Sequence, residues 1–180
     1  MFSSAEWNAF VVHWAGKIKP FLELVLGPYG TEPASRILPL RAIIVGNVAP
    51  SASFDMVTGQ IELTPSMEGD PGRTLEKLTH EMLHGSLSRF PSDDEFYDEG
   101  FVDLSTLLLS QAPLYGELGP LMEKSARGNL VRRIKSGMQP NANPYDRRRA
   151  CGAIHAKLTY GAGLIQHLRT QKMNGNFEWE

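Results

Sequence analysis

A helical pattern of apolar residues occupies the first part of the chain. A capping box formed by Ser3 and Glu6 opens it, and Gly27 with Pro28 ends it. The spacing predicts an amphipathic helix over about 4–26, kinked or broken at Pro20 because proline removes a backbone donor. The apolar positions of its inner face are Trp7, Phe10, Val11, Trp14, Ile18, Phe21, Leu22 and Val25.

The next apolar runs are short and predict strands. Residues 37–48 contain the β-branched run of a buried strand, bounded by glycine and proline. Residues 54–57 and 60–64 flank a Thr-Gly turn at 58–59 and predict two further strands. Apolar and polar residues alternate over 60–64, so we expect one wet face there, as on a strand at the edge of a sheet.

Helix signals dominate the rest of the chain. Asp70-Pro71 and Asn143-Pro144 each pair a capping side chain with a proline in the first turn, and Ser92 begins a second capping box. The expected helices cover 71–89, about 92–111, 118–135 and 144–172. Strands early and helices late predict a single α+β domain over 1–180, with a small mixed sheet that includes an edge strand.

Composition excludes several classes of protein. Hydrophobic residues make up 42% of the 180 residues and charged residues 21%, which is typical of globular domains rather than of disordered or fibrous chains. The longest apolar runs, near 21–26 and 104–109, are too short to cross a bilayer, so no membrane partner is expected. The single cysteine, Cys151, excludes an internal disulfide framework, and the first residues lack a signal-peptide pattern. We therefore expect a cytoplasmic protein, although a protein exported by a dedicated secretion system would show the same features.

Charge is divided unevenly along the chain. Residues 1–125 carry a net charge of −9 and residues 126–180 a net charge of +7. This split allows the two halves to pair, the first half to hold a cation, or the second half to attract a polyanion.

One motif carries recognisable chemistry. His80-Glu81-Met82-Leu83-His84 is an H-E-x-x-H pattern inside the predicted helix 71–89. Histidines four residues apart lie on one helical face about 6 Å apart and can reach one metal ion. Glu81 lies about 100° round the helix, where its carboxylate can act as a general base without being a ligand.

A third ligand is the test of this motif. A continuation with a third histidine fails, because Leu87 and Phe90 stand where glycine and histidine would be required. Glu99, on the next predicted helix, is the alternative. His84 and Glu99 each lie about 8–10 Å from the connecting loop, so an antiparallel hairpin brings them level. Asp103, one turn further, would lie near His80 and could accept a proton from its distal ring nitrogen.

With these residues in view, His80-Glu81-x-x-His84 followed by Glu99-x-x-x-Asp103 resembles the gluzincin branch of zinc metallopeptidases, the thermolysin-like group. Residues 98–101, Asp-Glu-Gly-Phe, are also similar to the segment around the third ligand in M1-type aminopeptidases. The resemblance covers roughly 60–104. It departs from the large members of the branch in a shorter interval between the second and third ligands, and the G-x-M-E-N motif of the M1 group is absent.

The resemblance implies a minimal zincin-like domain and a specific site. Residues 1–89 would supply the sheet and the active-site helix, and residues 90–180 the helical part with the third ligand. Zn²⁺ would be held by His80, His84 and Glu99, with Glu81 as general base and Asp103 behind a histidine. A peptide or protein substrate would add as a strand to the sheet edge at 60–64.

Two further groups of residues have less specific signals. Members of this branch commonly add a tyrosine or histidine that stabilises the oxyanion. The candidates are Tyr145, His155, Tyr160 and His167, of which Tyr160 is favoured. For each of them, packing or surface exposure is the preferred interpretation. The basic half contains arginines that we interpret as solvated or paired with the acidic half; contact with nucleic acid or with a substrate carboxylate is the alternative. These arginines are Arg132, Arg133, Arg147, Arg148 and Arg149.

The leading hypothesis is a zinc-dependent metallopeptidase. Three alternatives stay open: a non-catalytic zinc-binding or regulatory protein, a regulatory peptidase of a phage or mobile-element switch, and a nucleic-acid-binding module. The presence of Glu81 argues against a purely structural zinc site, because such a site has no use for a base.

Overall fold

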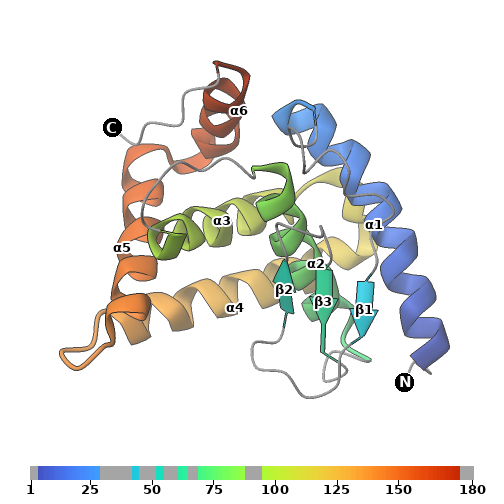
Figure 1. The fold of residues 1–180 in the computed structure, drawn as a ribbon, viewed down its shortest axis with the longest axis horizontal. Coiled ribbons are helices and arrows are strands. Elements are labelled where there is room, and N and C mark those ends of the chain that lie inside the picture. The colour runs from blue at the N-terminus through green and yellow to red at the C-terminus, as the bar shows by residue number, and fades with distance from the viewer. Residues whose placement is uncertain are drawn as a thin grey trace.

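The computed structural model describes residues 4–28, 42–44, 52–54, 61–64, 69–87 and 95–174. Helices form most of this part of the chain, and Figure 1 shows them around a small group of strands. In chain order the elements are α1 (Ser4–Leu26), β1 (Ala42–Ile44), β2 (Ala52–Phe54), β3 (Ile61–Leu63), α2 (Pro71–Ser86), α3 (Glu95–Leu109), the 3₁₀ helix η3 (Pro113–Leu118), α4 (Gly119–Gly137), α5 (Pro144–Thr159), the 3₁₀ helix η4 (Gly161–Gly163) and α6 (Leu164–Asn174).

The predicted α+β zincin-like fold is wrong. The fold is mostly helical, and each described strand has only three residues. Such short strands cannot form a layer that covers one side of the core, so helices enclose it instead. Of the strands expected at 37–48 and 54–57, the described residues are those of β1 and the last residue of β2. The rest of both ranges, like the turn at 58–59, lies outside the described residues.

The expected edge strand is also wrong. The strand order is β1-β3-β2, with β3 parallel to β1 and antiparallel to β2, so β3 is the central strand. Ile61 and Leu63 are buried and Glu62 is partly exposed, as their alternation predicts. Alternation of apolar and polar residues indicates which face of a strand contacts water, but it does not indicate whether the backbone edges of the strand are paired. Over the described residues of β3, 61–63, a substrate strand therefore has no free edge to pair with.

The ends of the helices agree better with the sequence patterns. The Asp70 side chain caps α2 by accepting from the Arg73 backbone N–H at 2.9 Å, and Asn143 caps α5 by accepting from Asp146 at 2.8 Å. The single helix expected over 144–172 is wrong, because the chain turns at Gly161, whose φ is +53°. Only glycine adopts this conformation readily, so α5 ends and α6 starts in a new direction.

Helix α2 is the centre of the molecule. Leu75, Leu78 and Met82 are fully buried, and α1, α3, α4, β2 and β3 all pack against this helix. In Figure 1, α2 lies behind the strands, between α1 and α4. A helix enclosed in this way must satisfy its polar side chains within the protein. Thr74 accepts from Trp7 of α1 at 3.1 Å, for example.

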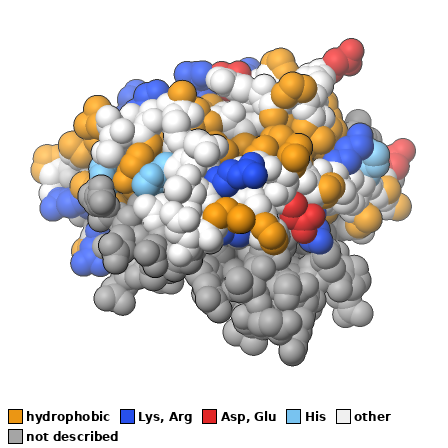
Figure 2. All heavy atoms as spheres, turned by 90° about the horizontal axis from the view of Figure 1, so that it is seen from above, with side chains coloured by type: hydrophobic (Ala, Val, Ile, Leu, Met, Phe, Trp, Pro, Cys, Tyr) orange, Lys and Arg blue, Asp and Glu red, His pale blue; other side chains and the backbone are white. Residues whose placement is uncertain are grey.

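None of the helices in the described part of the chain is both long and apolar enough to cross a membrane. Seen from above in Figure 2, hydrophobic side chains lie interspersed with charged and polar ones.

Candidate metal centre

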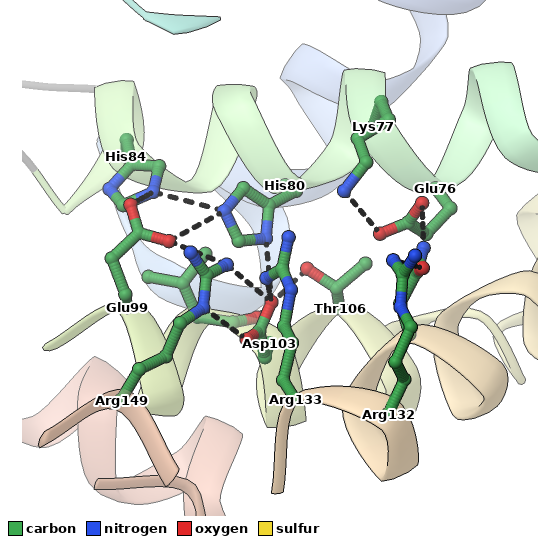
Figure 3. Close-up of polar contacts among 12 residues, drawn as sticks. Glu76, Lys77, His80, His84, Glu99, Asp103, Thr106, Arg132, Arg133 and Arg149 are labelled. Carbon is green, nitrogen blue, oxygen red and sulfur yellow. Dashed lines mark hydrogen bonds and ion pairs between the residues drawn. The ribbon is translucent and has the colours of Figure 1, made fainter. Parts of the chain in front are cut away.

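Two neighbouring helices bring three possible metal ligands together. His80 and His84 lie one turn apart on α2, and Glu99 reaches toward both from α3 (Figure 3). His80 Nε2 lies 3.3 Å from Glu99 Oε2, and His84 Nε2 lies 3.0 Å from Glu99 Oε1. The two Nε2 atoms are 3.2 Å apart. Within the described residues, this is the group of side chains whose donor atoms could hold a metal ion.

These distances fit a zinc ion. Around an ion with metal–nitrogen bonds of about 2.0–2.1 Å, tetrahedral donors lie about 3.3–3.4 Å apart. The two Nε2 atoms, at 3.2 Å, are close to this separation, and each lies 3.0–3.3 Å from one oxygen of Glu99. Two imidazole nitrogens and one carboxylate are also a donor set that zinc accepts at catalytic sites. The predicted ligands are thus brought to one point, although the first and the last of them lie 19 positions apart along the chain.

Electrostatics couples the same three side chains. Burial alone would raise the pKa of Glu99, but its hydrogen bonds with His80 and His84 and their charges hold that pKa well below its usual range. Burial likewise lowers the pKa of His84, but the hydrogen bond and charge of Glu99 outweigh it, and the net pKa is raised. Glu99 is therefore an ionised carboxylate, which is the form that a metal ion requires.

Glu81 lies beside this cluster without belonging to it. Its side chain is 7% exposed, and burial raises its pKa against the opposing charges of His80 and His84. A buried carboxylate with a raised pKa is suited to taking up a proton.

Asp103 lies where the sequence predicted it. Its Oδ1 is 3.4 Å from His80 Nδ1, one helical turn beyond Glu99. The pair lies within ion-pair distance but is not aligned as a hydrogen bond. Asp103 is itself held by two arginines that were not predicted in this place, Arg133 of α4 and Arg149 of α5.

Arg149 is the site residue that sequence reasoning missed. Its guanidinium is buried, with Nη2 2.7 Å from Glu99 Oε2 and Nε 2.7 Å from Asp103 Oδ2. The basic half of the chain therefore does pair with the acidic half through Arg133 and Arg149. Arg132, Arg147 and Arg148 are exposed and lie outside this cluster. A signal was available, because Arg149 shares a helical face with small residues that favour close helix packing: Gly152, Ala153 and Ala156.

The four candidates for an oxyanion donor lie in two different places, and only one of them is beside the cluster. The Tyr145 hydroxyl accepts from Arg149 Nη1 at 2.6 Å, and burial together with the charge of Glu99 raises the pKa of this tyrosine to about 12. Tyr160 instead packs with Phe101, two residues from Glu99 and so on the other side of α3, and His155 and His167 pack around Tyr160. Tyr145, rather than the favoured Tyr160, is thus the candidate beside the cluster.

Comparisons were made with protein-family models, with characterised proteins and with solved structures. None of the three yields a match to this chain. The site is therefore interpreted from its own geometry.

Proposed function

We propose that the chain is a zinc-dependent peptidase that hydrolyses a peptide bond at the His80–His84–Glu99 cluster, with Glu81 as general base. The observation that carries this proposal is the convergence of His80, His84 and Glu99 beside the buried carboxylate of Glu81. The two Nε2 atoms are 3.2 Å apart, and each lies 3.0–3.3 Å from one oxygen of Glu99. A structural zinc site uses four protein ligands, whereas three ligands leave a position for water and substrate.

Each residue then has a defined task. Zinc, when bound, supplies a Lewis acid that lowers the pKa of water and polarises a carbonyl. Glu81 takes a proton from the attacking water and delivers it to the leaving amine. Because burial raises the pKa of Glu81, the carboxylate binds this proton more readily than an exposed glutamate does.

The open side of the cluster indicates where a substrate approaches. The side chains of His84 and Glu99 are 21% and 22% exposed, whereas that of His80 is 4% exposed. A peptide therefore reaches the cluster from the His84 and Glu99 side, near the half-exposed Tyr145. The Tyr145 hydroxyl is the proposed partner for the substrate carbonyl oxygen.

The proposed compartment is the cytoplasm. Cys151 is an exposed free thiol, and a reducing compartment keeps such a thiol unoxidised.

The test separates zinc binding from catalysis. We expect the purified protein to contain one zinc ion per chain and to cleave members of a peptide library in a chelator-sensitive manner. Glu81→Gln should retain zinc and lose at least about 100-fold in kcat, because general base catalysis contributes about 10²–10⁴-fold. The control is Glu117→Gln, the same chemical change at an exposed position, which should retain full activity.

The outcomes discriminate among the open functions. Absence of stoichiometric zinc in the wild-type protein would contradict the metal site itself. Stoichiometric zinc without cleavage of any peptide would favour the non-catalytic zinc-binding protein. Full activity of Glu81→Gln would remove Glu81 from the proposed mechanism.

A further inference from the structure

The Arg149 guanidinium lies between the carboxylates of Glu99 and Asp103 of α3 (Figure 3). Its Nη2 is 2.7 Å from Glu99 Oε2 and donates to Asp103 Oδ1 at 2.9 Å, and its Nε donates to Asp103 Oδ2 at 2.7 Å. The contacts with Asp103 form the two-pronged pairing that fixes both the position and the plane of a guanidinium.

The third guanidinium nitrogen is engaged as well. Arg149 Nη1 donates to the Tyr145 hydroxyl at 2.6 Å. Because all three nitrogens have protein partners and the residue is only 6% exposed, Arg149 is not available to bind a substrate carboxylate. Arg133 also contacts Asp103, so two arginines and two α3 carboxylates balance each other's charge.

Close contact between two helices keeps Arg149 in place. A Cβ added to Gly152 of α5 would lie 2.1 Å from the Tyr97 carbonyl oxygen of α3, and one added to Gly100 would lie 2.3 Å from the Ala153 nitrogen. Both distances are impossible for real side chains, so only glycine allows this approach. The backbone that carries Arg149 is therefore held directly against the backbone that carries Glu99.

The two carboxylate oxygens of Glu99 have different partners. Oε1 faces His84 Nε2 at 3.0 Å, whereas Oε2 is held by Arg149 at 2.7 Å, a shorter contact than its 3.3 Å separation from His80 Nε2. A glutamate can bind a metal ion through one oxygen or through both. An oxygen that already accepts a strong charged hydrogen bond is a poorer second donor.

We infer that Arg149 is a positioning residue that restricts Glu99 to a single donor oxygen, Oε1, and so keeps one coordination position open. This inference rests on the proposed metal site, since it assigns how one of the three ligands of that site is presented. Asp103 acts through Arg149 by fixing the plane of the guanidinium.

The first experiment needs no variant. The wild-type protein is loaded with Co²⁺ in place of zinc, and its visible spectrum is recorded. One donor oxygen from Glu99, two imidazoles and a water give a four-coordinate ion, which absorbs strongly. Weak bands of a five- or six-coordinate ion in the wild-type protein would overturn the inference, whereas no cobalt or zinc binding at all would instead contradict the proposed function.

The second experiment compares Arg149→Lys with Arg147→Lys, a conservative change at an exposed position of the same helix. Lysine keeps the charge but cannot form the two-pronged pairing. We expect the visible bands of cobalt-loaded Arg149→Lys to weaken toward those of an ion with a higher coordination number. The zinc affinity of this variant, measured by chelator competition, should fall by about 10–100-fold. Arg147→Lys should match the wild type in both readouts.

Folding of each variant is checked by circular dichroism. An Arg149→Lys protein that folds and has the wild-type cobalt spectrum and zinc affinity would refute the positioning role while leaving the zinc site intact. If Arg149→Lys does not fold, the wild-type spectrum decides the inference.

Discussion

Helix α2 carries two buried polar clusters that differ in how their atoms are satisfied. Near its start, the charge-pair cluster consists of Glu76 and Lys77, both labelled in Figure 3, and Asn129 of α4. Lys77 Nζ lies 3.1 Å from Glu76 Oε1, and Asn129 donates to Glu76 Oε2 at 2.8 Å. One turn further, the ligand cluster consists of His80, His84 and Glu99.

The difference lies in the balance of donors and acceptors. In the charge-pair cluster each carboxylate oxygen has its own donor, and positive and negative charges match. In the ligand cluster two imidazole nitrogens and a carboxylate face one point. When both imidazoles are neutral and carry their protons on Nδ1, the lone pairs at this point outnumber the protons. Buried polarity by itself therefore does not indicate a site. A convergent surplus of lone pairs does, because a cation satisfies all of them at once.

The largest effect should come from removing one ligand. His84→Ala should lower zinc affinity by about 100- to 1,000-fold, since four ligands of a structural zinc site share about 10–16 kcal/mol. Added zinc should then raise the melting temperature of the wild type but not of the variant. The control is His13→Ala on the exposed side of α1, which should bind zinc like the wild type. Equal zinc affinity in His84→Ala and wild type would contradict the metal site, because the ligand cluster would then bind zinc no better than the charge-pair cluster does.

The next largest effect should come from disturbing the close contact between α3 and α5. This contact supports the ligand cluster and not the charge-pair cluster. Gly152→Ala places a methyl group 2.1 Å from the Tyr97 carbonyl oxygen and should destabilise the fold by about 3 kcal/mol, measured by urea unfolding. Gly128→Ala is the matched control, because Gly128 is exposed on α4 with nothing within 4 Å of the added carbon. It should stabilise by up to about 1 kcal/mol. A similar stability for the two variants would contradict the close approach of α3 and α5.

A smaller effect should distinguish the charge-pair cluster from the ligand cluster. Glu76→Gln keeps the shape of the side chain but removes the charge facing Lys77, which should lower the free energy of unfolding by about 1–3 kcal/mol. Zinc affinity should stay at the wild-type value, because Glu76 belongs to the cluster that is complete without a cation. A large loss of zinc affinity in Glu76→Gln would show that the clusters are one network.

The smallest effect concerns a third polar contact, at the end of α2. Lys172 of α6 donates to Ser86 and to the Gly27 carbonyl, each at 3.3 Å, and burial lowers its pKa to about 8. Lys172 therefore loses its proton at a lower pH in the folded state than in the unfolded state, where the pKa of a lysine is near 10.5. The contribution of Lys172 to stability should rise between about pH 8 and 10.5. Subtracting the unfolding curves of Lys172→Met from those of the wild type should reveal this slope, and parallel curves would contradict it.

Local signals along the chain predicted local features well. The Asp70-Pro71 and Asn143-Pro144 signals mark where α2 and α5 begin, because a cap and a first-turn proline act within one turn of the chain. The spacing from His84 to Glu99 predicted that the two would meet, because a short connection between two helices leaves few geometries.

Features that depend on distant segments were not predicted correctly. The position of β3 within the sheet depends on partners at 42–44 and 52–54, which its own alternation does not report. The helical spacing of Ile154, Leu158, Ile165 and Leu168 continues across Gly161, so this spacing does not indicate the break there. Arg149 and Tyr145 reach the cluster through α5, about 50 positions beyond Glu99. The small residues that share a face with Arg149 indicate close helix packing, but they do not indicate which helix lies opposite.

The sequence by itself determined the chemistry of the candidate site: two histidines one turn apart, a glutamate beside them and a second glutamate one helix later. Those relations follow from helix periodicity and a short connection, both local properties. The tertiary structure alone decided the mainly helical architecture and the guanidinium placed behind Glu99. Both depend on which faces pack together, and that choice is made by the burial of the whole chain at once rather than by any one segment.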